Sequence, residues 1–132
     1  MREILFRGKR TDNGKWVEGC LDFNQDKSLV FIRTPHIIYT DVNMVPLSTV
    51  GQYTGLKDKN GKRIFEGDIV KAQDDLTLSP FCYGLVGKVV YIETAFFIEP
   101  KDPTKSEYLF NECAVYEVLG NIHDDPELME VR

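Results

Sequence analysis

Residues 49–70 read TVGQYTGLKDKNGKRIFEGDIV, and this stretch decides the fold. Its Asn60-Gly61 pair stands between two apolar segments. Asn-Gly is the strongest short signal for a hairpin turn, because both central residues of that turn adopt positive φ. The Gly67-Asp68 pair that follows is typical of a tight turn into a strand, with the Asp side chain bonding back to the backbone. The stretch therefore predicts a hairpin and then the first strand of a new run of strands.

A second Asn-Gly pair, Asn13-Gly14, predicts another hairpin over residues 3–23. A polar break at 24–27 follows it, and residues 29–32 then have the β-branched and aromatic side chains of a buried strand. We expect further strands near residues 37–39, 84–91, 95–99 and 114–119. Strands at this spacing are typical of a sandwich or a small barrel.

Only one segment carries a good start signal for a helix. Asp125 is suited to capping, Pro126 is tolerated at the first helical position, and Glu127 interacts favourably with the positive end of the helix dipole. We expect one or two helical turns there. The sequence thus predicts a mainly β protein with very little helix.

Composition limits the class of protein. With 132 residues, 42% of them hydrophobic, the chain suits one compact domain or two small subdomains that share a core, and it is too short for a multidomain enzyme. No apolar run approaches the roughly 18 residues that a membrane span requires. Arg7, Lys9 and Arg10 also interrupt the apolar stretch that a signal peptide needs. We therefore expect a soluble protein without membrane association.

The cysteines favour a reducing compartment. Cys20, Cys82 and Cys113 are an odd number at wide spacings, with no Cys-x-x-Cys pair, so neither a zinc site nor a disulfide framework is indicated. The cytoplasm is the predicted location. The net charge of −5 disfavours general nucleic-acid binding by the overall field, although a local basic patch acts within a Debye length.

The candidate catalytic groups are weaker than their structural alternatives. His123, Asp124, Asp125, Glu127 and Glu130 form a candidate divalent-cation site, because carboxylate oxygens cluster there, but a capped helical turn explains them better.

Cys113 and His123 are close in the sequence, but no oxyanion-type glycine motif accompanies them. Neither a P-loop, a dinucleotide fingerprint nor a hydrolase motif occurs. We therefore assign no catalytic, cofactor-binding or metal-ligating residue.

Basic residues gather at the two predicted hairpin tips, near aromatic side chains. They are the candidate partner-binding surface, because such a surface would contact phosphates and stack bases. The alternative is two solvated hairpin tips. The candidate residues are Arg7, Lys9, Arg10, Trp16, Tyr53, Lys59, Lys62 and Arg63.

Several motifs together resemble the YopX family of phage and prophage proteins. They lie at 6–10, 12–19, 49–70, 117–122 and 125–128 and so span almost the whole chain. The resemblance implies an SH3-like barrel over the later part of the chain and an origin in a bacteriophage or an integrated prophage. It implies no activity and no site residues.

We therefore expect a small N-terminal β-hairpin subdomain at 1–56 and an SH3-like barrel subdomain at 57–132. The expected function is a non-enzymatic binding module that acts in the bacterial host cytoplasm on a protein or nucleic-acid partner, because SH3-like barrels commonly present loops and a groove for ligands. Two alternatives remain open. One is a small metal-dependent or cysteine-based hydrolase, and the other is a structural protein that self-assembles through exposed sheet edges as a homo-oligomer.

Overall fold

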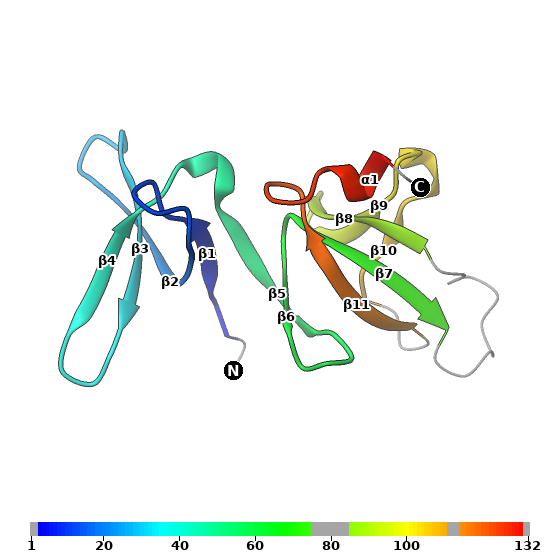
Figure 1. The fold of residues 1–132 in the computed structure, drawn as a ribbon, viewed down its shortest axis with the longest axis horizontal. Coiled ribbons are helices and arrows are strands. Elements are labelled where there is room, and N and C mark those ends of the chain that lie inside the picture. The colour runs from blue at the N-terminus through cyan, green and yellow to red at the C-terminus, as the bar shows by residue number, and fades with distance from the viewer. Residues whose placement is uncertain (1–2, 75–84, 111–113, 131–132) are drawn as a thin grey trace. The chain divides into compact units, whose positions relative to one another are not determined.

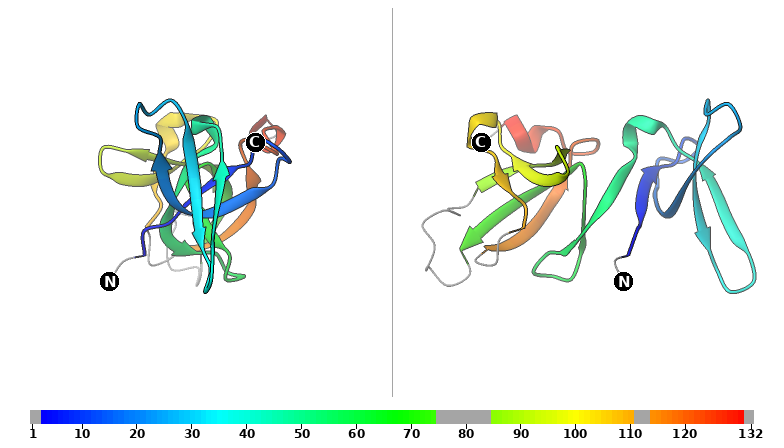
Figure 2. Two further views of the ribbon diagram at one scale, coloured as in Figure 1. Left: turned by 90° about the vertical axis from the view of Figure 1, so that its left-hand side faces the viewer. Right: turned by 180° about the vertical axis from the view of Figure 1, so that it is seen from behind.

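The structure is a computed structural model that describes residues 3–74, 85–110 and 114–130 (Figures 1 and 2). The chain divides into two compact units, Met1–Gly55 and Leu56–Arg132. Antiparallel strands make up most of both units, so the predicted mainly β class is confirmed.

The first unit is an antiparallel sheet in the order β4-β3-β2-β1-β5, with β4 at its edge (Figure 1). A short 3-10 helix, η1 (Leu47–Thr49), precedes β5, and the last residues of β5 belong to the second unit. The strands are β1 (Phe6–Lys9), β2 (Trp16–Phe23), β3 (Val30–Pro35), β4 (Thr40–Met44) and β5 (Gly51–Lys57).

The predicted hairpin over residues 3–23 is confirmed as β1 and β2. Their register pairs Phe6 with Gly19 and Lys9 with Trp16. The Arg10 N–H donates to the Lys15 carbonyl at 2.8 Å, and Gly14 adopts φ +70° in the turn. A glycine suits this position because positive φ costs it nothing sterically.

The strand predicted at 37–39 is wrong. These residues form the tip of the β3–β4 hairpin, which the His36 N–H closes by donating to the Tyr39 carbonyl at 2.7 Å. The Ile37 side chain is fully exposed and that of Ile38 is 89% exposed. Strand preference of β-branched residues depends on packing against neighbours, and the tip provides none for these two side chains.

The second unit is built on a five-stranded antiparallel sheet in the order β10-β9-β8-β7-β11. The end of β5 pairs with β6, and η2 (Pro103–Lys105) lies between β9 and β10. The strands are β6 (Arg63–Phe65), β7 (Asp68–Asp74), β8 (Leu85–Ile92), β9 (Ala95–Glu99), β10 (Glu107–Tyr108) and β11 (Ala114–Asn121). The three strands predicted in this part are confirmed within the described residues, whereas the SH3-like barrel stays a prediction.

The single α-helix among the described residues, α1 (Glu127–Glu130), begins directly after Asp125-Pro126. It has one turn, as predicted. This helix is far too short to cross a membrane, and no other helix in the described ranges is long and apolar enough to do so.

Each unit has its own apolar core. In the first, Ile32 is completely buried beside Val30 and Val45. In the second, residues of β6, β7, β8, β9 and β11 pack together around Ile64 and Val70. Full burial of one such side chain contributes roughly 1.5–3 kcal/mol, so these clusters hold the sheets in register.

The Gly67-Asp68 turn forms as its sequence predicts. The Asp68 carboxylate is almost fully buried and accepts a hydrogen bond from the Phe65 N–H at 2.8 Å, while Gly67 adopts φ +93°. The Gly67 N–H donates to the Val89 carbonyl, which ties the turn to β8. This turn fixes where β7 begins.

Candidate partner-binding site

The loop between β5 and β6 is organised by the carboxylate of Asp58. One oxygen, Oδ1, accepts hydrogen bonds from the N–H groups of Asn60 and Lys62, each at 2.9 Å. The other, Oδ2, accepts from the Val118 N–H at 3.0 Å. Asp58 is only 7% exposed, so one buried side chain shapes the loop and attaches it to β11.

The same hydrogen bonds control the protonation of Asp58. Burial by itself would raise the pKa of this carboxyl group, because it disfavours the charged form. Hydrogen bonds from the backbone N–H groups of Val118, Lys62 and Asn60, together with the Lys62 charge, outweigh burial and hold the pKa of Asp58 below its ordinary value. The carboxylate is therefore the form that the fold stabilises.

Lys59 makes a second attachment to β11. Its backbone N–H donates to the Tyr116 carbonyl at 2.8 Å, and its Nζ lies 3.6 Å from Oε2 of Glu117. The ion pair is largely exposed, so it contributes little to stability. The backbone hydrogen bond is the contact that positions the segment.

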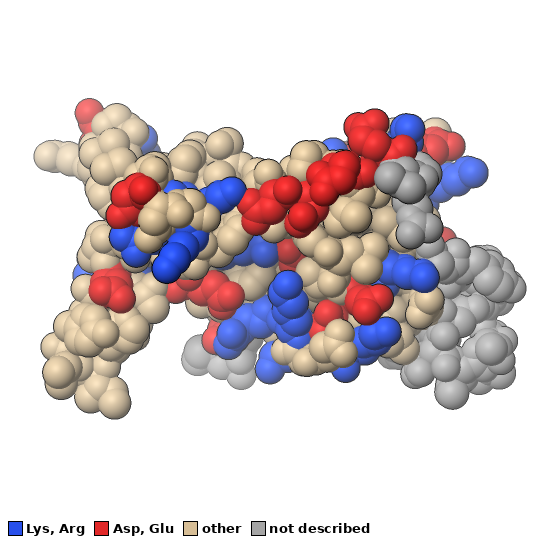
Figure 3. All heavy atoms as spheres, viewed as in Figure 1, with Lys and Arg blue, Asp and Glu red and all other residues tan. Residues whose placement is uncertain are grey.

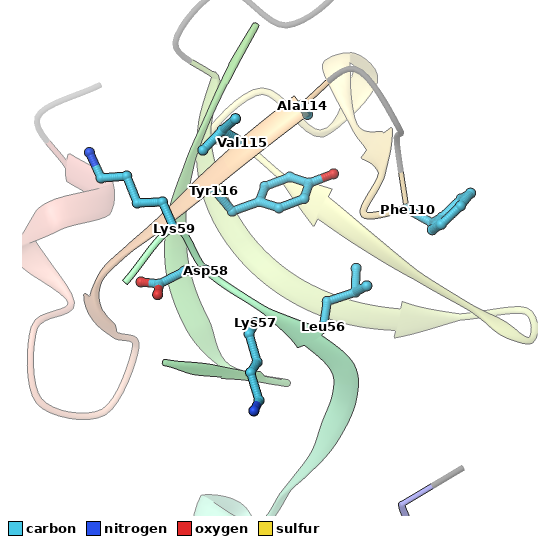
Figure 4. A pocket seen from close by; sticks show the side chains of 8 residues that line it. All are labelled: Leu56, Lys57, Asp58, Lys59, Phe110, Ala114, Val115 and Tyr116. Carbon is cyan, nitrogen blue, oxygen red and sulfur yellow. The ribbon is translucent and has the colours of Figure 1, made fainter. Parts of the chain in front are cut away.

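A pocket of about 260 Å³ opens beside this attachment (Figure 4). Leu56 and the Tyr116 ring point into it, and Phe110 borders one side. The Tyr116 hydroxyl donates to the Leu109 carbonyl, which fixes the orientation of the ring. The pocket is lined by Leu56, Lys57, Asp58, Lys59, Phe110, Ala114, Val115 and Tyr116.

The rim of the pocket is basic. Lys57 and Lys59 line it, and Figure 4 shows both ammonium groups directed outward into solvent, away from Leu56 and Phe110. Lys62 is exposed in the same loop, and Arg63 is half-buried. In contrast, acidic side chains gather over the turn at 121–126 and over α1 (Figure 3).

The predicted binding residues of the first unit are largely occupied by contacts within the protein. Arg7 is 8% exposed and its guanidinium lies 4.7 Å from the centre of the Trp16 ring. Arg10 pairs with Asp12 at 2.6 Å, and Tyr53 is buried. Lys9 is half-buried, and its backbone N–H donates to Thr49 Oγ1 at 3.1 Å.

Of the predicted binding residues, Lys59 and Lys62 are thus the exposed ones, and Lys59 also lines the pocket. The apolar lining residues Leu56, Phe110 and Tyr116 were not predicted. They come from distant parts of the chain, and no local motif marks them. An alternation pattern identifies apolar strand positions but does not show which of them border an open space.

The acidic tail is not arranged as a metal site. The Asn121 side chain donates a hydrogen bond to Asp124 at 3.1 Å, and its backbone N–H donates to Asp125 at 3.3 Å. Both carboxylates therefore stabilise the turn. In the part of the chain that the structure describes, no three His, Cys, Asp or Glu side chains are grouped as ligands would be. Cys113 lies outside the described residues, so the cysteine hypothesis is not tested.

The family model of the YopX protein matches residues 5–130, nearly the entire length. The chain belongs to the YopX family. The matched residues span both units and include those that line the pocket. No curated protein matches the chain.

Solved structures resemble this YopX-family chain, among them the following two. A crystal structure of protein EF1440 from Enterococcus faecalis matches with a TM-score of 0.57 and 24% identity, over 98% of this chain and 99% of that one. A crystal structure of protein yopX from Bacillus subtilis matches with a TM-score of 0.59 and 16% identity, over 97% and 98% of the two chains. At these identities the likeness shows a shared fold.

Proposed function

We propose that this YopX-family chain is a non-enzymatic binding module whose second unit recognises a protein partner. The observation that carries the proposal is the pocket beside β11, with its apolar lining and its two rim lysines. Binding surfaces commonly combine a central apolar anchor position with a charged, solvated rim. This surface includes Lys59 from the predicted binding residues, and Lys62 is exposed in the same loop.

The proposal places the protein in the cytoplasm of a bacterial host, as the product of a phage or prophage. Two observations support the bacterial cytoplasm: the similar structures of EF1440 and yopX come from bacteria, and Cys20 is an exposed free thiol. Exposed free thiols suit a reducing compartment.

The test is capture of partners by the tagged full-length chain from host cells, with half of each sample treated with nuclease. The variants are the double substitution Lys57→Glu/Lys59→Glu and the control Lys101→Glu, which is an exposed lysine beyond β9 in the same unit. We expect a protein that survives nuclease, is lost with the double variant and is retained by the control.

The other outcomes are equally decisive. A partner that disappears with nuclease would assign the surface to nucleic acid. A partner that still binds the double variant would show that the pocket is not part of the interface.

A second candidate function, self-assembly, has one specific observation in its favour. The tip of the β3–β4 hairpin exposes Ile37 and Ile38, and β4 is a sheet edge in the first unit. Edge strands with exposed apolar side chains tend to pair with other chains. Light scattering over a range of concentrations tests self-assembly, with Ile37→Ser/Ile38→Ser as the comparison variant. If the unsubstituted chain is a monomer at high concentration, self-assembly is excluded.

A further inference from the structure

We infer that the pocket beside β11 binds a short extended peptide, taking one apolar side chain into the pocket and pairing a neighbouring carboxylate with Lys57 or Lys59. This inference rests on the binding function proposed above and specifies the class of ligand.

The size and lining of the pocket suit one side chain. Its volume of about 260 Å³ lies below the roughly 300–1,000 Å³ of sites that enclose whole small molecules. Leu56, Tyr116 and Phe110 give it three apolar contacts, and Phe110 is 69% exposed although it is a large aromatic residue. An aromatic side chain held at the mouth of a pocket is typical of the anchor positions of protein interfaces.

The rim selects a negative group next to that apolar side chain. The Asp58 carboxylate accepts hydrogen bonds from three backbone N–H groups, so its oxygens are directed at the backbone and not at the ammonium groups of Lys57 and Lys59. Lys57 is exposed, and Lys59 is 44% exposed with only a long contact to Glu117. A ligand carboxylate near either ammonium group therefore gains a favourable charge interaction at the rim.

The direction of the β11 backbone favours an extended chain as ligand. The Tyr116 carbonyl accepts from Lys59 and the Val118 N–H donates to Asp58, so these two residues direct their backbone polar groups away from β7. Such groups alternate sides along a strand, and Ala114, two residues before Tyr116, directs its N–H and carbonyl the same way. Ala114 lines the pocket, so a bound peptide has a backbone donor and acceptor beside it.

Charge favours a peptide over nucleic acid at this site. From residue 56 onward the sequence has nine Lys and Arg residues but fifteen Asp and Glu residues. A nucleic acid carries many phosphate charges, and the net negative charge of this unit repels them. One or two ligand carboxylates at the rim interact mainly with the nearby lysines, because more distant charges are screened.

The experiment is an NMR titration of the ¹⁵N-labelled full chain with blocked synthetic peptides. The probe is acetyl-Gly-Glu-Leu-Glu-Gly-amide. One matched peptide has Lys in place of both Glu residues, and another has Ser in place of Leu. We expect the probe to shift the amide signals of Lys57, Lys59, Ala114 and Tyr116 at millimolar concentration. Both matched peptides should bind at least about fivefold more weakly than the probe, which corresponds to roughly 1 kcal/mol of binding free energy.

Three variants test the three parts of the argument. Phe110→Ser removes the exposed apolar border, and Lys57→Glu/Lys59→Glu reverses the rim charge. Ala114→Pro removes the outward N–H at the first residue of an edge strand, where proline is tolerated. Each should weaken binding of the probe at least about threefold with the rest of the spectrum unchanged, and Lys101→Glu should have no effect. If Ala114→Pro fails to fold, the other two variants decide.

Equal binding of all three peptides, or shifts confined to other residues, would overturn the inference. So would shifts of these amides by the oligonucleotide dT10 when no peptide causes them. If no peptide binds while cells still yield a nuclease-resistant partner that depends on Lys57 and Lys59, the peptide inference fails and the proposed function stands. If that partner is absent too, both fail.

Discussion

The carboxylate of Asp58 accepts a hydrogen bond from the backbone N–H of Val118, sixty residues later in the chain, at 3.0 Å. This contact joins a hairpin loop to the last strand of the second unit, and the pocket opens beside it. Because Asp58 also accepts from Asn60 and Lys62, one side chain determines both the shape of the loop and its place.

Replacing Asp58 should therefore destabilise the second unit. Asp58→Ala leaves three backbone N–H groups without their charged acceptor, and hydrogen bonds to charged groups contribute about 1.5–3 kcal/mol each, with incomplete additivity. We expect a loss of about 2–4 kcal/mol. Hydrogen exchange of the Val118 amide measures it, and Asp26→Ala in an exposed loop of the first unit is the control that should leave that amide protected. An unchanged Val118 exchange rate would contradict the role of Asp58.

The stabilisation by Asp58 should depend on pH in one direction. Its pKa is lower in the folded chain than its ordinary value, so the folded state favours the ionised form. The stabilisation is fully present above the ordinary Asp pKa of about 4 and is lost as pH falls through the lowered pKa of the folded state. Urea unfolding of the unsubstituted chain and of Asp58→Asn should therefore differ at pH 7 and converge in acid. A difference that grows as pH falls would mean that the sign is wrong.

Two isoleucines of the β3–β4 hairpin should respond very differently to truncation. Ile32 is completely buried in the core of the first unit, so Ile32→Ala should cost about 2–5 kcal/mol of unfolding free energy. Ile37 at the tip is fully exposed, and Ile37→Ala should change stability by no more than about 0.5 kcal/mol. Thermal or urea unfolding of both variants checks this, and a large cost at Ile37 would show that the tip is covered in solution.

Gly19 should not tolerate a side chain. A Cβ built on it would lie 2.1 Å from the Arg33 carbonyl oxygen on the neighbouring strand. Because that oxygen belongs to the backbone, the strands must separate, and we expect Gly19→Ala to cost about 1–3 kcal/mol or more.

The adjacent residue offers a matched control for Gly19. Cys20 is exposed, so Cys20→Ala should be nearly neutral. Denaturant unfolding of both variants compares them, and equal stability of the two would mean that β2 and β3 adjust without strain.

Local chemistry explains why most of the fold was predictable. The Asn-Gly turns, the Gly67-Asp68 turn and the start of α1 each depend on residues a few positions apart, and the structure has a turn or a helix start at each place. At both Asn-Gly pairs only the glycine adopts positive φ, whereas the sequence predicted it for the asparagine as well. The exception at 37–39 shows the limit of this approach. β-branched residues predict a strand only where neighbours pack against them, and here the chain reverses direction instead.

The sequence by itself determined where the chain turns and which class of fold it adopts, because turn residues and side-chain alternation act over short distances. Only the tertiary structure decided that Leu56, Phe110 and Tyr116 border one pocket and that Arg7 is buried against Trp16. Such contacts depend on strand order and register, which bring Leu56 together with residues more than fifty positions later and set Arg7 against Trp16 across the β1–β2 pair. The physical reason is that a strand's sequence specifies which face is apolar, while its partner and its open edge are set by the packing of the whole unit.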